Sequence, residues 1–327
     1  MLTGKTRWGY AMVFNESGWR VTHPNPDDDR SVLALMRAYD TAVSGEPDTD
    51  LDDVQHDWEA IDLTQDAWLV HSDPGELCAY AAVLPHQTRE LRLDIYTAPA
   101  MIEGELPGML LDECLKRSEE ISAASGDDRV ERLVAYLLHS NKHYRNVFEQ
   151  AGFRAVRYIF QMRMEMHEPP REPKWPEGIH ARSFMPAEDE LETYELVQEA
   201  FDRPGRVRPS FENWKKHMLR PGSYRPELWT LAFAGQELVG VCLGFDYPDE
   251  GWVRQLGVRE DWRGLGLGSA LLRNAFAIFF KEGKRKVGLT TESDNPNALA
   301  FYERIGMTVR RQYDEYTKAI GSARTGE

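Results

Sequence analysis

A strand, a glycine-rich loop and a helix follow one another between Gly251 and Lys281. The apolar run Trp252–Val258 is rich in bulky and β-branched residues, which predicts a buried strand. Arg263–Gly268 then holds three glycines in six residues. The apolar residues that follow are spaced three and four apart, as in an amphipathic helix: Leu272, Ala275, Phe276 and Phe279.

A glycine-rich loop in front of a helix suits anion binding. Glycine has no Cβ to keep a phosphate away from the backbone, the free N–H groups of the loop point at the anion, and the positive end of the helix dipole lies behind them. Arg263 adds a guanidinium at the start of the loop. The stretch therefore predicts a phosphate-binding site.

Two common phosphate-binding loops are excluded by the residues themselves. A P-loop ends in Gly-Lys followed by Ser or Thr, whereas Gly268 is followed by Ser269 and Ala270. A dinucleotide-binding loop has a third glycine at its sixth position and an acidic residue about twenty residues further on. Here Ser269 takes the sixth position, and residues 284–286 are all basic.

The order Arg263-Gly-Leu-Gly-Leu-Gly268 resembles motif A of the GNAT acyltransferases. After a predicted strand at Lys286–Glu292, residues 295–307 (Asn-Pro-Asn-Ala-Leu-Ala-Phe-Tyr-Glu-Arg-Ile-Gly-Met) resemble motif B of the same family. The resemblance implies that the loop backbone holds the pyrophosphate of coenzyme A and that Tyr302 is the general acid. Asn295 fits both a helix N-cap and a cofactor contact. The cofactor-binding residues implied by the family are Leu256, Gly257, Val258, Arg263, Gly264, Leu265, Gly266, Leu267, Gly268, Ser269 and Asn295.

A chain of 327 residues suits two domains, and its two halves share one order of predicted elements. After a hairpin turn at 15–18, the first half is expected to hold strands at 67–71, 77–84, 91–96, 130–139 and 153–166, with helices at 109–124 and 142–151. The second half is expected to hold strands at 179–183, 228–234, 237–245, 286–292 and 308–319, with helices at 187–200 and 211–219. Pro169–Pro176 contains four prolines, a composition that favours extended chain. The predicted domains are therefore 1–168 and 177–327, joined by a linker at 169–176.

The first half differs from the second at the positions where chemistry is expected. Residues 103–108 stand in the place of the glycine loop, but Glu103 replaces the arginine and Pro107 has no N–H to offer a phosphate. Residues 141–153 match motif B with Phe148 in the place of Tyr302. We therefore expect a degenerate first domain with a structural or substrate-shaping role, and a catalytic second domain, as in tandem GNAT proteins such as mycothiol synthase.

The family resemblance also gives the fold class. We expect a mixed α/β protein with two tandem GNAT acyl-CoA N-acyltransferase domains. Each should be a twisted, mostly antiparallel sheet flanked by helices.

The net charge of −15 falls almost entirely in the first half. Residues 1–168 contain 16 Lys and Arg against 30 Asp and Glu, whereas residues 169–327 contain 23 against 24. Nucleic-acid binding is disfavoured because it needs a basic face. The second half is the one whose charge suits a polyanion such as coenzyme A.

Composition sets further expectations. No apolar run is long enough to span a membrane, and residues 1–7 do not read as an apolar signal segment. Three cysteines far apart in apolar surroundings favour reduced buried thiols and a cytoplasmic location: Cys78, Cys114 and Cys242. The histidines, such as His139, His143 and His217, have no metal-ligand spacing, so no metal is expected. A monomer or a homodimer is expected.

The chemistry implied by the family is direct attack of a neutral amine on the thioester of acetyl-CoA. A phenol with a pKa of about 10 stays protonated at neutral pH, so Tyr302 can protonate the departing thiolate. The alternative role of Tyr302 is packing in a helix interface. The general base is not evident, because residues 252–255 contain no carboxylate and the nearest acids are Asp249, Glu250 and Glu292.

Four residues are candidates for contact with the acceptor: Arg254, Gln255, Glu292 and Trp214. Gln255 could hold a water that relays a proton, and Arg254 could bind a carboxylate or phosphate of the acceptor or form a salt bridge within the protein. The predicted function is acetyl-CoA-dependent transfer of an acetyl group to a primary amine of a small molecule. Transfer from another acyl-CoA, and a non-catalytic coenzyme A-binding module, are the alternatives.

Overall fold

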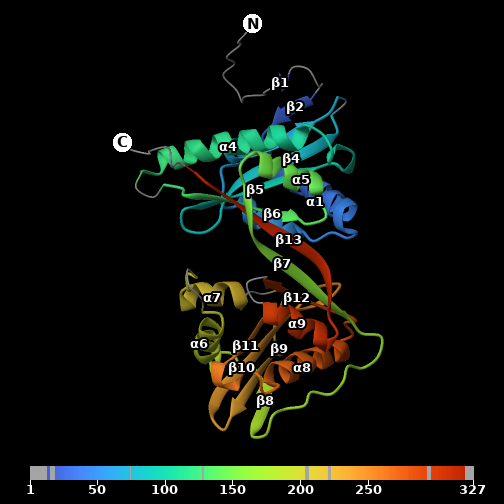
Figure 1. Ribbon diagram of the computed structural model, residues 1–327, viewed down its shortest axis with the longest axis vertical. Helices are drawn as coiled ribbons and strands as arrows, with labels where there is room; N and C mark the ends of the chain where they lie inside the picture. The colour runs from blue at the N-terminus through green and yellow to red at the C-terminus, as the bar shows by residue number, and fades with distance from the viewer. Residues whose placement is uncertain are drawn as a thin grey trace. The chain divides into compact units, whose positions relative to one another are not determined.

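The computed structural model describes residues 13–14, 19–73, 75–126, 129–202, 206–219, 222–292 and 296–320. The predicted hairpin turn at residues 15–18 lies outside these ranges. Internal contacts divide the chain into two compact units (Figure 1). The first unit comprises Met1–Ile159 and Arg311–Glu327, and the second comprises Phe160–Arg310.

The sheet of the first unit has the strand order β1-β2-β3-β4-β5-β6-β13. Its ladders are antiparallel except the one between β5 and β6, which is parallel. The strands are β1 (Val13–Phe14), β2 (Trp19–Thr22), β3 (Ala67–His71), β4 (Leu77–Pro85), β5 (Glu90–Thr97), β6 (Arg132–Leu138) and part of β13 (Thr308–Ala319). The helices are η1 (Pro26–Asp28), α1 (Asp29–Ser44), α2 (Leu51–Trp58), α3 (Leu63–Asp66), η2 (Pro99–Met101), α4 (Leu106–Ala124) and α5 (Lys142–Gln150).

Both faces of β4 are buried, which is why this strand reads as a continuous apolar run. One set of alternate residues packs in a core with α4 and α5: Ala79, Ala81 and Val83. The other set packs with α1 and α2: Tyr80, Ala82 and Leu84. Side chains of a strand point alternately to its two faces, so helices cover both sides of this sheet.

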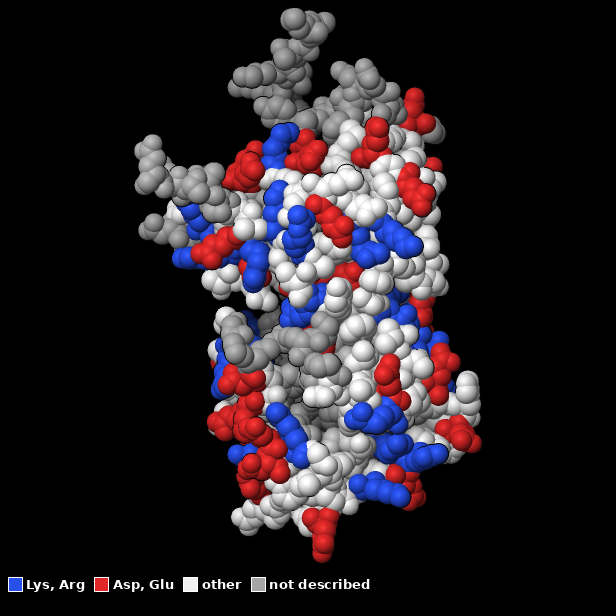
Figure 2. All heavy atoms as spheres, viewed as in Figure 1, with Lys and Arg blue, Asp and Glu red and all other residues white. Residues whose placement is uncertain are grey.

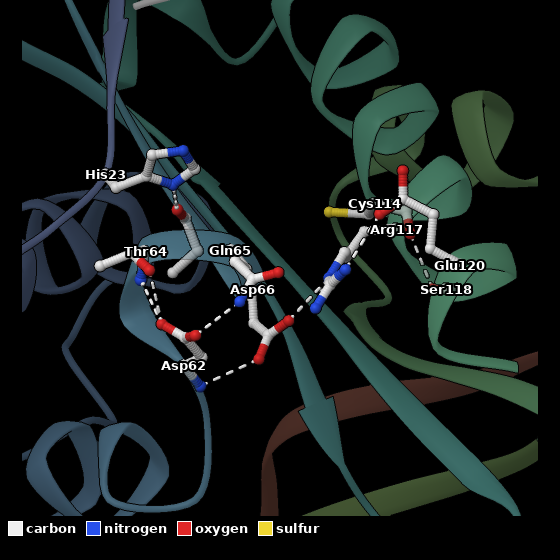
Figure 3. A network of polar contacts seen from close by, with 10 residues as sticks. His23, Asp62, Thr64, Gln65, Asp66, Cys114, Arg117, Ser118 and Glu120 are labelled. Atoms are coloured by element: carbon white, nitrogen blue, oxygen red, sulfur yellow. Dashed lines mark hydrogen bonds and ion pairs between the residues drawn. The ribbon is translucent and has the colours of Figure 1, made fainter. Parts of the chain in front are cut away.

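The short helix α3, which the sequence did not predict, is held by polar contacts (Figure 3). Asp62 caps it by accepting the backbone N–H of Thr64 at 3.0 Å. At the end of α3, Asp66 accepts a hydrogen bond from Nε of Arg117, a residue of α4, at 2.8 Å. Arg117 also donates to Glu120 at 2.9 Å. Four residues are too few for a periodic apolar pattern, so these side chains define the helix instead.

The sheet of the second unit has the strand order β7-β12-β11-β10-β9-β8. The ladders from β8 to β11 are antiparallel, and β11 pairs with β12 in parallel. The strands are β7 (Arg154–Glu165, in part), β8 (Ile179–Ser183), β9 (Tyr224–Ala234), β10 (Glu237–Asp246), β11 (Gly251–Val258) and β12 (Lys286–Glu292). The helices are α6 (Glu190–Ala200), α7 (Phe211–Met218), η4 (Glu260–Trp262), α8 (Leu267–Lys281) and α9 (Pro296–Ile305).

Helices α8 and α6 cover opposite faces of this sheet, and glycines let α8 approach closely. A Cβ on Gly251 of β11 would lie 2.4 Å from Cδ1 of Phe279, so only glycine fits beneath α8 at this point. On the other face, a Cβ on Gly257 would meet Leu196 and Ala200 of α6. The buried face of α8 therefore fixes the position of its N-terminus at the end of β11.

The final strands of the two halves are exchanged between the units. β13 pairs with β6 in the first unit, and β7 from Phe160 onward belongs to the second. Tyr316 is accordingly buried in the first core, and Met162 and Met166 are buried in the second. These bounds differ from the predicted domains, which assigned residues 160–168 to the first and 311–327 to the second. The segment 169–176 has no helix or strand and lies within the second unit.

The predicted fold class is confirmed: each unit is a mostly antiparallel sheet with one parallel pair and helices on its faces. Most predicted strands lie within one or two residues of the observed ones. The helix predicted from residue 109 begins at Leu106, and the helix predicted from residue 187 begins at Glu190. The three cysteines are free and buried.

The strand exchange makes a testable prediction. Tyr316→Ala in the C-terminal strand should destabilise the first unit by about 3 to 5 kcal/mol, because it leaves a cavity in that core and removes the hydrogen bond from the Tyr316 hydroxyl to Glu149. Hydrogen exchange should accelerate in β6 and α5, while Thr317→Ala, which alters a less buried side chain, should have a small effect. Faster hydrogen exchange confined to α8 and β11 of the second unit would show that Tyr316 does not stabilise the first unit.

Candidate functional site

The second unit contains a cleft of about 1040 Å³ between β11 and β12. The parallel ladder of these strands runs from Gly251 and Val287 to Val253 and Leu289, and the later residues of both strands line the cleft. Opposite β10, the register shifts so that Gln255 pairs with Leu243 while Val253 pairs with Gly244. Arg254 is therefore the extra residue of a β-bulge, a feature that bends a strand and re-aims a side chain.

The lining residues come from four parts of the unit: the end of α6 and the segment after it, β11 with the glycine loop, β12, and α9. They are Ala200, Phe201, Arg206, Val253, Arg254, Leu256, Val258, Trp262, Arg263, Gly264, Gly266, Gly268, Ser269, Leu289, Thr290, Thr291, Glu292, Asn297, Ala298, Phe301, Tyr302 and Arg304. Four of these are arginines and one is a carboxylate. The lining is thus strongly basic although the whole chain has a net charge of −15.

Charge is also segregated on the surface of this unit (Figure 2). Carboxylates gather over α6, which carries Glu190, Glu192, Glu195 and Glu199, and Lys and Arg side chains gather around α8.

Two glycines of the glycine loop have a backbone conformation that favours glycine. Gly264 and Gly266 have φ angles of +78° and +89°, in the left-handed region that side-chain-bearing residues rarely adopt. Gly266 is the N-cap of α8, and no side chain caps this helix. Because the first N–H groups of a helix have no partners within it, they are available to an anion in the cleft. A Cβ on Gly268 would make only ordinary contact with Phe301, so its lack of a side chain is less restrictive.

Arg263 anchors the loop. Its Nε donates to the carbonyl of Val258 at 3.0 Å, and its Nη2 donates to the carbonyl of Ala200 at 3.2 Å. These bonds tie the start of the loop to the ends of β11 and α6. Nη1 has no partner among the described residues, so the guanidinium keeps both its charge and donors for a ligand.

Tyr302 lies on α9 and lines the cleft, with its ring centroid 5.1 Å from that of Phe301. Burial raises the pKa of the phenol from 10.0 to about 12, and the neighbouring Cys242 adds a smaller effect in the same direction. The hydroxyl therefore remains protonated at neutral pH.

The acids considered in the sequence have different environments. Glu292 is the one carboxylate among the described residues of the lining. Glu250 lies 3.1 Å from Nε of Arg163, an ion pair that gives it a structural role, and neither it nor Asp249 lines the cleft. The strand before the loop thus has no carboxylate facing the cleft, as its sequence indicated.

Several predicted site residues do not line the cleft with their side chains. Trp214 is 3% exposed and packs against Tyr194, Phe211 and Trp229, so the predicted substrate contact is replaced by a core role. Gln255 is not in the lining either, and its buried Oε1 has no hydrogen-bond partner within the described ranges.

The remaining predicted cofactor residues are four. Three of them lie in β11, the glycine loop or the start of α8, and the fourth lies outside the described residues. Gly257, Leu265 and Leu267 contribute backbone there, with Leu267 buried and Leu265 59% exposed. Asn295 lies outside the described residues. The cleft is also lined by three residues that the sequence did not predict: Trp262, Phe301 and Arg304. Of these, only Phe301 could have been inferred from the sequence, because it is adjacent to Tyr302.

The corresponding region of the first unit is closed. β5 and β6 also lose their pairing, after Arg92 and Val134, but the space beyond is only about 30 Å³. Five tyrosines line it: Tyr39, Tyr96, Tyr136, Tyr144 and Tyr313. Gly104 and Gly108 do not have positive φ angles, and Pro107 lies in the first turn of α4.

Comparison with known proteins identifies the family. The sequence profile of the acetyltransferase (GNAT) family matches residues 189–307, a range that includes every described residue lining the cleft. A solved GCN5-related N-acetyltransferase from Sphaerobacter thermophilus is 34% identical, with a TM-score of 0.81 over 94% of this chain and 97% of that one. A mycothiol acetyltransferase from Streptomyces coelicolor is 30% identical over 242 residues, which cover 73% of this chain and 75% of the relative. The chain belongs to the GNAT family.

The GNAT fold accounts for both units. A tandem GNAT protein from the clavulanic acid biosynthesis pathway aligns with 94% of this chain and 100% of its own, with a TM-score of 0.69 at 17% identity, which shows a shared fold. Against three other mycothiol acetyltransferases the matched segment spans 55%, 54% and 56% of their length, so this chain matches about half of those relatives.

Within the described ranges, no three His, Cys, Asp or Glu side chains gather in a way that could hold a metal ion. None of the helices in the described residues combines the length and the apolar character that a membrane crossing requires.

The raised pKa of Tyr302 predicts a pH-dependent stability. The phenol ionises near pH 10 in the unfolded chain and near 12 in the folded one, so its contribution is present below pH 10 and is lost as pH rises through 12. Relative to Tyr302→Phe, wild type should lose about 1 kcal/mol of unfolding free energy between pH 9 and pH 11. Urea titrations of both proteins at each pH measure this difference; a constant difference would show that the pKa is not raised.

Proposed function

We propose that this GNAT protein is an acetyl-CoA-dependent N-acetyltransferase, in which a primary amine of a small molecule attacks the thioester directly within a ternary complex. The GNAT fold and the mycothiol acetyltransferase relatives support acetyl transfer to a small-molecule acceptor. The observation that carries the proposal is the junction of an open strand edge with an uncapped helix N-terminus in one cleft.

The two features suit the two ends of coenzyme A. The N–H groups of residues 264–269 would hold the pyrophosphate, and Arg263 would add a charge-assisted contact. Beyond Val253, β11 pairs with β10 on one edge and faces the cleft on the other. That free edge can bind the pantetheine amides in the manner of an added strand, through Leu256, Gly257 and Val258.

The residues then supply the parts of an acyl transfer. The amine nitrogen forms a bond to the thioester carbon, and a backbone N–H of β11 stabilises the oxyanion, an interaction worth about 3 kcal/mol in comparable sites. As the carbon–sulfur bond breaks, the sulfur takes the phenolic proton of Tyr302. The proton lost by the amine passes to water or to Glu292, the one carboxylate in the described part of the lining, and the Tyr302 phenolate regains a proton from water.

The first unit is proposed to be degenerate. Its counterpart of the cleft is filled by tyrosines, and its loop has neither left-handed glycines nor an arginine. A structural or substrate-shaping role follows for this unit. One coenzyme A is expected to bind per chain.

The acid role of Tyr302 can be tested by following free thiol release from acetyl-CoA over a panel of amines. Tyr302→Phe should lower kcat by about 100- to 10,000-fold with little change in the KM for acetyl-CoA, because the proton donor is lost while the cofactor contacts remain. The control is Tyr224→Phe, which removes a buried hydroxyl that has no hydrogen-bond partner and lies outside the cleft lining.

The outcomes separate the candidate functions. Full activity in Tyr302→Phe would remove the acid assignment. Binding of acetyl-CoA without turnover of any amine would favour the non-catalytic module, and faster turnover with a longer acyl-CoA would favour another acyl donor.

The proposal that the glycine loop binds the phosphates of coenzyme A can be tested with two glycines that have nearly the same left-handed φ angle. Gly266 and Gly283 have φ angles of +89° and +88° at opposite ends of α8, and a Cβ on either would meet no atom within 4 Å. Substitution by alanine should destabilise both variants by a similar 1 to 2 kcal/mol, roughly the cost of a left-handed side-chain-bearing residue. Only Gly266→Ala should weaken coenzyme A binding in calorimetry, by about tenfold or more. Equal affinities in the two variants would place the phosphates elsewhere.

A further inference from the structure

One of the four arginines in the described lining of the cleft, Arg254, lies away from the glycine loop. Arg254 is four residues before the end of β11, which corresponds to about 13 Å along the strand at roughly 3.3 Å per residue. The glycine loop begins beyond the other end of this segment, after Val258. A single cleft thus has an anion-binding loop at one end and a guanidinium at the other.

Arg254 is held in place but is not neutralised. The guanidinium carbon lies 5.0 Å from the ring centroid of Phe245, and Nη1 donates to the carbonyl of His217 at 3.3 Å. In the described part of the chain no carboxylate pairs with Arg254. Arg182, Arg225 and Arg259 of the same unit, in contrast, form ion pairs with Asp or Glu.

The bulge explains why this side chain reaches the cleft. Arg254 has no residue opposite it on β10, and the parallel ladder with β12 ends one residue earlier, at Val253. A bulge re-aims the side chain that it carries. The stacking on Phe245 and the bond to His217 then limit its rotamers, so a fork of donors is preorganised at little further entropic cost.

Glu292, the one carboxylate in the described part of the lining, lies at a different position along the strands from Arg254. Glu292 lies three residues beyond the last paired residue of β12, whereas Arg254 lies one residue beyond the last paired residue of β11. The carboxylate is therefore nearer to the loop and Arg254 is further from it. An acceptor whose amine meets the thioester would extend its far end toward Arg254.

From this placement we propose that the acceptor is a primary amine that also carries a carboxylate or phosphate group, and that Arg254 binds this anionic group and determines specificity. The inference rests on the proposed acetyl transfer in the same cleft. The cofactor phosphates are expected at the glycine loop, which leaves the guanidinium at the opposite end for the acceptor. A charge-assisted, two-pronged contact is the strongest recognition that such a side chain offers.

The test uses matched pairs of amines that differ in the anionic group. L-serine is compared with L-serinamide, and O-phosphoethanolamine with ethanolamine, in wild type and Arg254→Gln. Wild type should favour the anionic member of at least one pair, and the pair shows whether carboxylate or phosphate is preferred. Arg254→Gln should lower kcat/KM for that member by about 10- to 100-fold and leave the neutral member within about twofold.

A matched control exists in the same unit. Arg285 also stacks on a phenylalanine, Phe280, at 3.9 Å, and donates to a main-chain carbonyl at 3.0 Å, but it does not line the cleft. Arg285→Gln should leave all four acceptors unchanged. Equal losses for anionic and neutral amines in Arg254→Gln would indicate a structural role and overturn the proposal.

A binding measurement separates this inference from the proposed activity. Calorimetry of the same four amines with the coenzyme A-loaded protein requires no turnover. Selective binding of an anionic amine that Arg254→Gln abolishes would support the inference even if no acetyl transfer occurred. If neither anionic amine binds or reacts better than its neutral partner in wild type, the inference is wrong, whether or not acetyl transfer takes place.

Discussion

The site depends on the loss of pairing between two parallel strands. β11 and β12 are joined at Gly251–Val253 and then separate, with a bulge at Arg254 marking the change. Without that separation β11 would have no free edge for a ligand, and the N-terminus of α8 would face a closed sheet. Closely packed glycines and the buried face of α8 hold the strands at the joined end, so the opening is fixed by the core and not by the loop alone.

The two units show how one architecture can keep or lose such an opening. In both, a parallel pair of strands separates after a short ladder. In the first unit, tyrosines from α1, α5 and β13 enter the gap and pack on one another, with Tyr39 5.3 Å from Tyr96 and 5.4 Å from Tyr144 between ring centroids. In the second, the lining is arginine-rich and the space remains. The two units thus share the same arrangement of strands but differ in the cavity, because large side chains fill the space in the first unit and leave it open in the second.

The sequence predicted the parts of this structure that depend on local chemistry. The apolar run of β11 and the helix after the loop follow from residues close together in the chain, and the fold class followed from the motifs. The left-handed conformation of Gly264 and Gly266 was not predicted, although glycine is the residue that permits it. The exchange of β7 and β13 could not be predicted, because both strands carry patterns compatible with either sheet and the choice is made by long-range packing of Tyr316 and Met162. Trp214 was assigned to the site although it packs among aromatic residues of the core, a distinction that requires knowledge of which face of α7 is buried.

We propose that the backbone of residues 264–269 in the second unit holds the two linked phosphates of coenzyme A. A crystal structure of the protein with bound coenzyme A would show whether it does. We expect pyrophosphate oxygens within hydrogen-bond distance of amide nitrogens in this loop, with the pantetheine along the free edge of β11. Coenzyme A lodged against residues 103–108, or a loop without contact to phosphate, would contradict it.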